Sequence, residues 1–532
     1  MVHTLLAAAA LAAIPTSGQD EILLVEGGPV PGAPGASVGF LSSYRLDGRG
    51  VWSARIFVSS LGGGLAVTSD GRSIVDGTAL SVGTVNSTTS PIVSPLGVLA
   101  TQSSVRVALP NDNEWILFWD GSPVAREGTP VVDGSGTPVG ALAELGPNVF
   151  DLDGDERIIF VGPLAGADED ERSLFEIDLT PAQAGAPRLL LGPSAPYPDG
   201  TEVIDVVSVS VNDAGHLLTV AEERLGGFSA VGVRVDGQLV ARTGSPAPVP
   251  GHLWDLDEAA SFGAATSFHL DDTGAVTITG RLTGPFGTSV AVARDQQLVA
   301  WTGPDVGLPA RSVAAIARGA TSTPRGHVLW FGAESSGGPV VLFEDQDVLL
   351  APGDGFAGET IDVVRAGGAT ENGGFLAVLV DLADGRTAVL RRALPVEVQG
   401  CQPAGPNSVG LLPQLHALGS DFADRAPLHL SASGLPPLQG CILAVGSAAG
   451  LSAIPGSQGT LCLTGAVGRF PTVLNSGAAG RVEFELDAAS LPLPGAPAIQ
   501  PGETWHFQCW YRDLNPTTTS NLTSSAIITF RG

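Results

Sequence analysis

VGVRVDGQLVARTG at residues 231–244 and VAVARDQQLVAWTG at residues 290–303 are two copies of one pattern. In each copy an apolar strand is followed by a short polar turn, a second apolar strand and a closing Gly. The same closing glycine ends strand-like runs at five further positions: Gly27, Gly77, Gly128, Gly192 and Gly353. Seven strand-like runs that end in the same closing Gly indicate a repeat protein built from small antiparallel sheets.

A second pattern alternates with the first. A short polar residue is followed three positions later by Gly and then by an apolar strand, as in Asn212/Gly215 and Asp271/Gly274. The polar side chain can bond the turn backbone, and Gly can adopt a positive φ. The other members are Asp47/Gly50, Ser94/Gly97, Asp151/Gly154, Thr323/Gly326 and Thr370/Gly373. The two sets interleave, so each unit of roughly 50 residues holds about four strands, which is typical of a propeller blade.

The two ends of the repeat array predict how it closes. The first unit begins directly at residues 21–24, whereas the last unit is followed by an extra strand, TAVLRR, at residues 387–392. A ring forms if this strand completes the unit begun by residues 22–58, and closure removes exposed strand edges. We therefore predict an all-β fold with a seven-bladed β-propeller over residues 19–395. An open β-solenoid of the same units is the alternative.

The composition changes at the C-terminal end of the chain. The repeats stop, and all four cysteines follow: Cys401, Cys441, Cys462 and Cys509. Six or more short strands with Pro and Gly between them predict an antiparallel β-sandwich over residues 401–532. Alternation along TWHFQCWYRD at residues 504–513 places Cys509 on an apolar, core-facing side. An even number of cysteines in an exported chain indicates two disulfides, for which three pairings exist.

Charge and hydropathy restrict the compartment and the partners. The 532-residue chain has a net charge of −28, and all 26 of its basic residues are Arg. Such a surface argues against nucleic acid and anionic membranes as partners. Residues 1–18 have the apolar run and small closing residues of a secretory signal peptide. No later segment is long and apolar enough to span a membrane. We expect a secreted or cell-surface protein.

Two resemblances add to this interpretation. The Asn-x-x-Gly pattern, with Asn itself only at Asn212, resembles the tandem NxxGxxxF repeats of exported planctomycete proteins over about residues 20–395. Segments such as SASGLPP (431–437) and PGETWHFQCWYRDLNPTTTSNLT (501–523) resemble a C-terminal domain common on planctomycete secreted proteins. The second resemblance implies that Cys441 and Cys509 form one pair, which leaves Cys401 with Cys462. Neither family implies a catalytic residue.

One segment has the appearance of a calcium loop. Asp151, Asp153 and Asp155 lie in DLDGDE, but an EF-hand loop starting at Asp151 needs Gly at position 156 and Glu at position 162. Glu156 and Gly162 occupy those positions. Since the segment is also the third copy of the polar turn, we interpret it as structural. A calcium site of another kind is the alternative, and calcium is the one cofactor that the sequence suggests.

The best candidates for ligand contact lie on the outer side of the strand at 504–513. His506, Trp510 and Arg512 share that side, where Trp510 could stack on a sugar ring or a peptide. We predict a non-catalytic extracellular binding or cell-surface-associated protein whose partner is a glycan or another protein. One competing hypothesis is a propeller-based glycan hydrolase or lyase, which needs carboxylates or a His/Tyr pair converging at the axis. Another is a structural component of the cell envelope.

Overall fold

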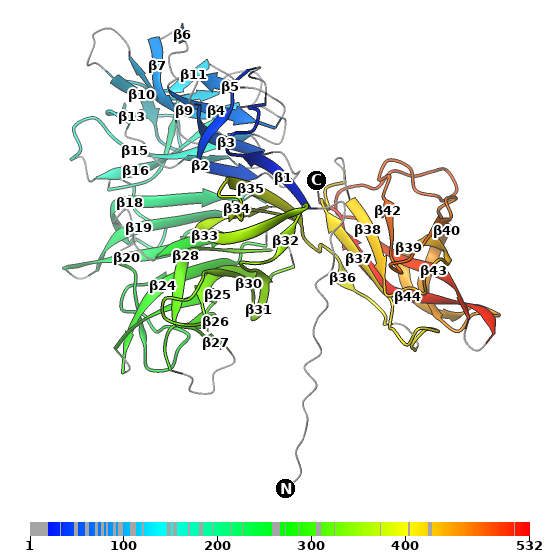
Figure 1. Cartoon of the computed structure of the whole chain (residues 1–532). Helices are drawn as coiled ribbons and strands as arrows, with labels where there is room; N and C mark the ends of the chain where they lie inside the picture. The colour runs from blue at the N-terminus through cyan, green and yellow to red at the C-terminus, as the bar shows by residue number, and fades with distance from the viewer. Residues whose placement is uncertain are drawn as a thin grey trace.

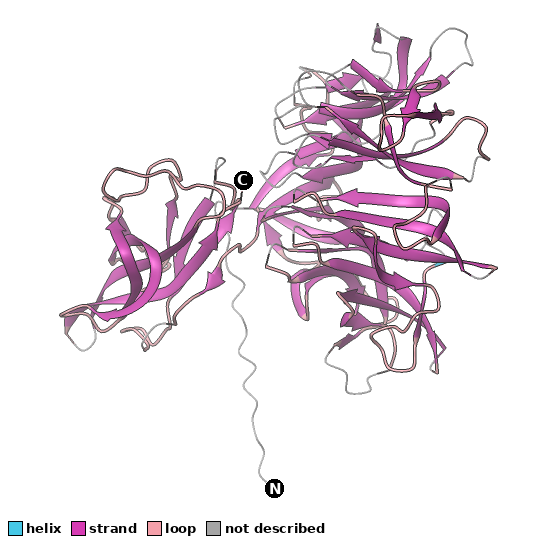
Figure 2. Ribbon diagram, turned by 180° about the vertical axis from the view of Figure 1, so that it is seen from behind, coloured by secondary structure: helices cyan, strands magenta, loops and turns pink. Residues whose placement is uncertain are grey.

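Among the residues that it describes, the computed structural model consists of β-strands joined by turns and loops (Figures 1 and 2). The structure describes residues 20–531 except 32, 34, 47–51, 59–62, 70–72, 76–78, 81–82, 89–91, 94–98, 107–112, 120–121, 146–149, 153–156, 169–170, 180–184, 194, 213, 226, 258–265, 272, 286, 305–309, 324, 373, 403–404, 424–427 and 515–516. The predicted signal peptide, residues 1–18, lies outside the described residues. None of the described residues forms a helix long and apolar enough to cross a bilayer.

The strands of residues 20–393 form separate sheets, numbered here in chain order. Sheet 1 holds β2 (Val38–Leu46), β3 (Trp52–Val58), β4 (Gly63–Thr68) and β5 (Ser73–Val75). Sheet 2 holds β6 (Ala79–Leu80), β7 (Gly83–Thr88), β8 (Ile92–Val93), β9 (Leu99–Arg106), β10 (Asn113–Trp119) and β11 (Ser122–Ala125). Sheet 3 holds β12 (Pro130–Val132), β13 (Pro138–Ala141), β14 (Phe150–Leu152), β15 (Arg157–Pro163), β16 (Arg172–Asp178) and β17 (Arg188–Leu191).

Four further sheets complete this part of the chain. Sheet 4 holds β18 (Glu202–Val211), β19 (Leu217–Leu225), β20 (Phe228–Val235) and β21 (Gln238–Arg242). Sheet 5 holds β22 (Leu253–Asp255), β23 (Ser267–Leu270), β24 (Val276–Gly284), β25 (Gly287–Arg294), β26 (Gln297–Trp301) and β27 (Arg311–Ser312). Sheet 6 holds β28 (Ala315–Ser322), β29 (Val328–Ala333), β30 (Val341–Glu344) and β31 (Asp347–Leu350). Sheet 7 holds β1 (Asp20–Val25), β32 (Gly355–Phe356), β33 (Glu359–Asn372), β34 (Phe375–Leu382) and β35 (Thr387–Ala393).

Successive sheets pack face to face around a common centre, which gives a propeller-like arrangement (Figure 1). The leading strands contact one another in turn, from β14 through β18, β23, β28 and β33 to β2. Apolar side chains fill the seams between sheets, for example Val292 of sheet 5 against Trp330 of sheet 6. Because β33 of sheet 7 contacts β2 of sheet 1, the last sheet meets the first.

The N-terminal strand joins the end of the array. β1 pairs antiparallel with β35, from Asp20 opposite Arg392 to Val25 opposite Ala388. The guanidinium of Arg392 reinforces the pairing with a 3.0 Å contact to Asp20. Of the strands in residues 22–58, however, only β1 joins the sheet of β35. The prediction that the extra strand completes the whole unit of residues 22–58 was therefore wrong for β2 and β3. β2 pairs with β3 and β3 pairs with β4, so these strands form a sheet of their own.

The polar turns have the geometry that their sequence predicts. Gly215, Gly274 and Gly326 have φ values of +81°, +81° and +80°, which confirms the need for glycine. The Asn212 side chain accepts a 2.8 Å hydrogen bond from the backbone N–H of His216. The turn also faces the preceding sheet, because a Cβ on Gly274 would lie 3.2 Å from the His216 ring. These glycines therefore shape both the turn and the seam between sheets.

The C-terminal module has two sheets that share one core (Figure 1). Sheet 8 holds β36 (Val398–Gln399), β39 (Gly440–Ala453), β40 (Thr460–Arg469), β41 (Leu474–Asn475), β43 (Thr504–Leu514) and β44 (Thr518–Thr529). Sheet 9 holds β37 (Gln414–Gly419), β38 (Leu428–Ser433) and β42 (Val482–Glu485). Side chains from both sheets meet in the core, including Leu430, Phe484 and Phe507.

One of the two expected disulfides is present. Cys401 is bonded to Cys462, which ties the start of the module to β40. The expected Cys441–Cys509 bond is absent, and both thiols are free and buried. In the strand register Cys441 lies opposite Tyr511 and Cys509 lies opposite Leu443, so the two cysteines are diagonal neighbours. A hydrogen bond with Cys509 lowers the pKa of the Cys441 thiol, so the two thiols are in contact without a covalent bond.

The segment at residues 394–400, which connects the ring to the C-terminal module, lies where the two parts of the chain touch. A Cβ on Gly374 would lie 2.1 Å from the carbonyl oxygen of Gly419, so the β33–β34 turn touches the end of β37. The fully buried carboxylate of Glu397 accepts a 3.0 Å hydrogen bond from the backbone N–H of Ala417 and contacts His416 Nδ1 at 3.0 Å. The connecting segment is thus held as part of the C-terminal core.

Candidate functional site

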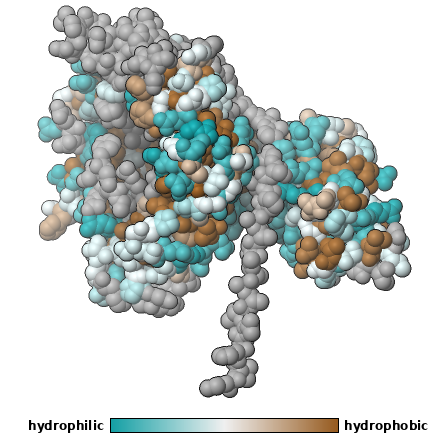
Figure 3. Space-filling view, in the orientation of Figure 1, coloured by the Kyte–Doolittle hydropathy of each residue, from teal (hydrophilic) through white to brown (hydrophobic). Residues whose placement is uncertain are grey.

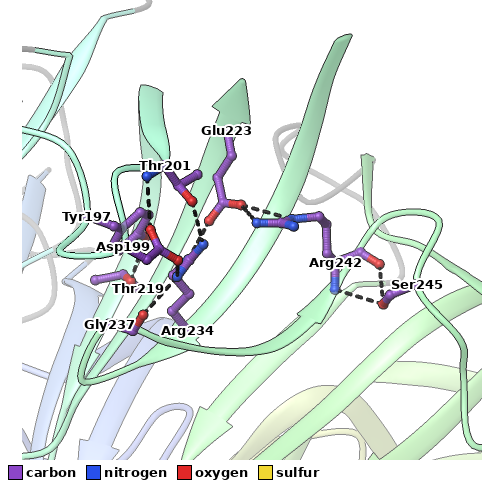
Figure 4. A network of polar contacts seen from close by, with 9 residues as sticks. All are labelled: Tyr197, Asp199, Thr201, Thr219, Glu223, Arg234, Gly237, Arg242 and Ser245. Atoms are coloured by element: carbon purple, nitrogen blue, oxygen red, sulfur yellow. Dashed lines mark hydrogen bonds and ion pairs between the residues drawn. The ribbon is translucent and has the colours of Figure 1, made fainter. Parts of the chain in front are cut away.

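A network of polar side chains lies in sheet 4 and the loop before it (Figure 4). Glu223 on β19 is fully buried and lies between two arginines. Arg234 Nε on β20 donates to one carboxylate oxygen at 2.6 Å, and Arg242 Nε on β21 donates to the other at 2.9 Å. Gly232 leaves room for this carboxylate, because a Cβ there would lie 2.5 Å from it.

The loop before sheet 4 closes over Arg234. The guanidinium donates to Asp199 at 2.8 Å and to Thr201 Oγ1 at 3.1 Å, and it lies 4.2 Å from the Tyr197 ring centroid. Hydrogen bonds from the Thr201 backbone and side chain, together with Arg234, lower the pKa of Asp199. Burial raises the pKa of Tyr197 to about 12, while its hydroxyl bonds Thr219 at 2.9 Å.

This arrangement indicates a structural role for the cluster. A general acid or base needs a proton-accepting oxygen within reach of a substrate. Both oxygens of Glu223 are instead occupied by guanidinium groups. The Arg234 side chain extends from β20 to the loop at residues 197–201. The cluster therefore connects β19, β20 and β21 to that loop.

Other acidic side chains of the ring are paired in the same way. Carboxylate–guanidinium contacts connect neighbouring strands or sheets at Glu114–Arg126 (3.0 Å), Asp205–Arg172 (2.5 Å), Glu176–Arg188 (2.8 Å) and Asp271–Arg294 (2.6 Å). In each pair the carboxylate is the more buried partner. Arginine is suited to this use because its planar group forms two hydrogen bonds with one carboxylate and stays charged when buried.

Two histidines occupy equivalent turn positions, as their places after the turn glycine indicate. His216 Nδ1 lies 2.7 Å from Asp236, and His327 Nδ1 lies 2.5 Å from Asp345. Each aspartate also accepts a backbone hydrogen bond from the residue after the histidine. The contact with Asp345 raises the pKa of His327. These pairs bind strand ends together within a sheet.

The acidic turn at 151–156 is only partly described. Asp153 and Asp155 lie outside the described residues. The Asp151 carboxylate accepts hydrogen bonds of 3.1 Å from the Ser210 hydroxyl and from the Val211 backbone, both in the next sheet. Asp151 thus connects sheets 3 and 4. Within the described residues, no group of three or more His, Cys, Asp or Glu is placed to hold a metal ion.

The structure brings together two of the three residues predicted for ligand contact. The Arg512 guanidinium lies 5.2 Å from the centroid of the Trp510 ring, within the range of a cation–π interaction. Trp510 is half-buried and Arg512 is exposed. His506 is separated from them by Gln508, which is buried because its amide bonds Cys462 N and the Thr460 carbonyl. The three residues do not form one continuous surface.

A groove of about 660 Å³ lies at one end of the C-terminal module. Its lining is mostly apolar, with buried Leu486 and Ile499, and carries the exposed side chains of Glu485, Asp487 and Gln500. The space-filling view shows apolar and polar residues interspersed over the visible face of the module (Figure 3).

Sequence reasoning missed the Glu223 cluster. One signal was present, since Arg234 stands in the strand VGVRV with its side chain on the same side as Gly232. A charged residue beside Gly within an apolar strand suggests a buried partner that needs space. The sequence could not identify that partner, because Glu222 and Glu223 are adjacent and point to opposite faces.

Comparisons with known proteins identify no family. No family model and no curated protein matches the chain. Among solved structures, the chain is similar to PorZ, a surface component of the type-IX secretion system of Porphyromonas gingivalis, with 13% identity and a TM-score of 0.36. The match covers 93% of this chain and 60% of PorZ, so this chain spans less than two thirds of that protein.

Two further similar structures are those of enzymes that act on glycans. A polysaccharide lyase has 10% identity and a TM-score of 0.35, and the match covers 69% of this chain and 93% of the lyase. An α-L-arabinanase from Penicillium chrysogenum has 11% identity and a TM-score of 0.26, over 57% of this chain and 91% of the enzyme. At this level of similarity, none of these proteins supplies an argument about activity.

Proposed function

We propose that this chain is an exported, non-catalytic binding protein in which a seven-bladed β-propeller carries a C-terminal β-sandwich. In this interpretation sheets 1–7 are the blades, β1 completes the last blade, and sheets 8 and 9 are the layers of the sandwich. The arginine-paired carboxylates of the ring support a rigid scaffold rather than a set of free acid–base groups. The disulfide Cys401–Cys462 supports an oxidising compartment.

The observation that carries a binding role is the contact between Trp510 and Arg512. An aromatic ring with a guanidinium alongside offers a flat apolar surface and several hydrogen-bond donors. This combination suits the apolar face and hydroxyl groups of a sugar ring, or an extended peptide. We therefore place the ligand contact on the outer side of β43, with an extracellular glycan as the first ligand class to test.

Binding of the purified full-length chain to a panel of neutral and acidic oligosaccharides tests this function. For a glycan that binds, we expect Trp510→Ala to weaken the Kd about tenfold or more, which corresponds to about 1.4 kcal/mol. Phe228→Ala is the matched control, because Phe228 is an aromatic residue of the ring with 81% exposure. Equal binding by Trp510→Ala and the native chain would exclude this surface.

The same panel separates binding from catalysis. A glycan-acting hydrolase or lyase releases shortened or unsaturated products, whereas a binding protein returns its ligand unchanged. Products formed by the native chain would replace our proposal with the enzymatic alternative. Self-assembly of the purified chain without any ligand would favour a structural role in the envelope.

A further inference from the structure

Strand β42 forms a free edge of sheet 9. The strands of this sheet run in the order β37, β38 and β42, and no described strand pairs with the other side of β42. The opposite edge is covered, because Val396 of the connecting segment donates its backbone N–H to the carbonyl of Ala417 on β37. An unpaired edge presents N–H and C=O groups to which another extended chain can bond.

The strand register shows which backbone groups of β42 face this edge. Phe484 lies opposite Leu430, and the backbone N–H of Leu486 donates to the carbonyl of Leu428. Residues of an antiparallel pair alternate between hydrogen-bonded and non-hydrogen-bonded positions. The backbone of Glu483 and of Glu485 therefore faces away from β38. Within the described residues, neither has a backbone–backbone hydrogen bond on that side.

The exposed face of the same edge is acidic. Glu483, Glu485 and Asp487 alternate with core residues such as Phe484, so their side chains project from the outer face. Arg481 lies 2.8 Å from the Glu483 carboxylate and neutralises it. Among the described residues, Glu485 and Asp487 have no such cationic partner. Two negative charges are therefore available to a ligand.

The groove at the end of the C-terminal module begins where β42 ends. Glu485 and Asp487 contribute exposed carboxylates to it, and Leu486, Ile499 and Pro501 are among the apolar residues of its lining. No basic residue is present among the described residues of this lining. A Lys or Arg side chain suits such a groove, because its aliphatic part can lie on the apolar surface while its charged group contacts the carboxylates.

We propose that the free edge of β42 and the adjoining groove bind an extended, basic segment of a partner protein. The segment adds a strand to sheet 9, and its Arg or Lys side chains contact Glu485 and Asp487. A second copy of this chain does not fit, because its own edge would bring carboxylates against carboxylates. The net charge of −28 also repels a second copy and attracts a basic partner. This surface is separate from the outer side of β43 and does not depend on glycan binding there.

Strand pairing determines which residues of the segment make both kinds of contact. A residue directly opposite Glu485 projects its side chain from the same face and exchanges both backbone hydrogen bonds with it. The basic residues of the segment must therefore also donate their backbone N–H groups to β42. The residues between them direct their N–H groups away from the sheet.

A fluorescent peptide of about ten alternating Arg and Val residues tests this geometry on the purified full chain at about 0.15 M salt. We expect methylation of the Arg backbone nitrogens to weaken the Kd about tenfold or more, and methylation of the Val backbone nitrogens to change it less than about twofold. The two methylated peptides have the same charge and composition, so the comparison isolates the strand pairing. Equal binding of the two would contradict strand addition. So would the absence of binding by the unmethylated peptide at about 1 mM.

Glu485→Gln/Asp487→Asn tests the charges beside the edge. Both side chains are exposed, so we expect an unchanged Tm and a Kd for the peptide that is weaker by about tenfold. Glu127→Gln/Glu144→Gln is the matched control, because it removes two exposed carboxylates from the ring and changes the net charge equally. An equal loss of affinity in the two variants would mean general attraction to an acidic chain and would overturn the proposal.

Sedimentation distinguishes a partner segment from a second copy. We expect the native chain to keep the same oligomeric state with and without the peptide, because the edge is free before the peptide binds. A native dimer that the peptide dissociates would assign the edge to a second copy instead.

Discussion

The ring and the C-terminal module are both built from antiparallel strands, but they are stabilised differently. The ring divides its apolar residues among several seams and joins strands with buried arginine–carboxylate pairs, such as Arg234–Glu223. The module has one core shared by two sheets, together with a disulfide. Residues 426–468 of the module contain no Asp, Glu, Lys or Arg. The module uses a buried pair of this kind as well, at Asp421–Arg531, so the difference lies in its single apolar core and its disulfide.

The strongest test of this comparison removes the central charge of sheet 4. Glu223→Gln removes the buried carboxylate that Arg234 and Arg242 share and leaves Arg234 with the half-exposed Asp199, so we expect a loss of about 3 kcal/mol in the free energy of unfolding. Chemical denaturation measures it. Glu202→Gln is the control, because the Glu202–Arg224 pair is exposed and should change stability by less than about 0.5 kcal/mol. Equal stability of the two variants would mean that the ring does not depend on its buried charges.

The disulfide provides the corresponding test for the module. It closes a sequence separation of 61 residues, so reduction should cost about 2–4 kcal/mol. We expect calorimetry to show that a reductant lowers the unfolding temperature of the module and leaves that of the ring unchanged. A Cys441→Ala/Cys509→Ala variant should respond to reductant as the native chain does. Loss of that response would reveal a second disulfide.

Lowering the pH should reduce the stability of the ring through His269. The unfolded imidazole takes up a proton near its ordinary pKa of 6.5, whereas the folded one does so only near pH 4. The ring should therefore lose about 2–3 kcal/mol as the pH falls through this interval. Unfolding measured across the interval should show a shallower loss for His269→Gln. Parallel curves for the variant and the native chain would contradict the burial of this side chain.

The smallest expected effect is at His327. Its contact with Asp345 raises the pKa, so the stabilisation is complete below pH 6.5 and is lost as the pH rises through the folded value. Both side chains are more than a third exposed, which limits the effect to about 0.5 kcal/mol. His327→Gln should remove this alkaline loss in a denaturation series. A larger effect would indicate that the pair is shielded from solvent in solution.

Much of the fold was predictable because its signals are local. Turn glycines, alternating strands and the extra strand at 387–392 all follow from short-range geometry. The β1–β35 pairing was likewise indicated by a unit that lacks a strand at one end and an array that has a spare one at the other. The candidate site was less predictable. Trp510 and Arg512 share a face by alternation, but the cover over Gln508 that separates His506 comes from a distant strand.

The sequence by itself therefore determined the strand content, the repeat and the turns, since each depends on a few neighbouring residues. Only the tertiary structure decided that Cys441 and Cys509 lie diagonally, that Glu223 lies between Arg234 and Arg242, and that β42 presents carboxylates beside a free sheet edge. These facts depend on register and on which sheet faces which. A one-residue change in register would alter them while leaving the local pattern of strands and turns the same.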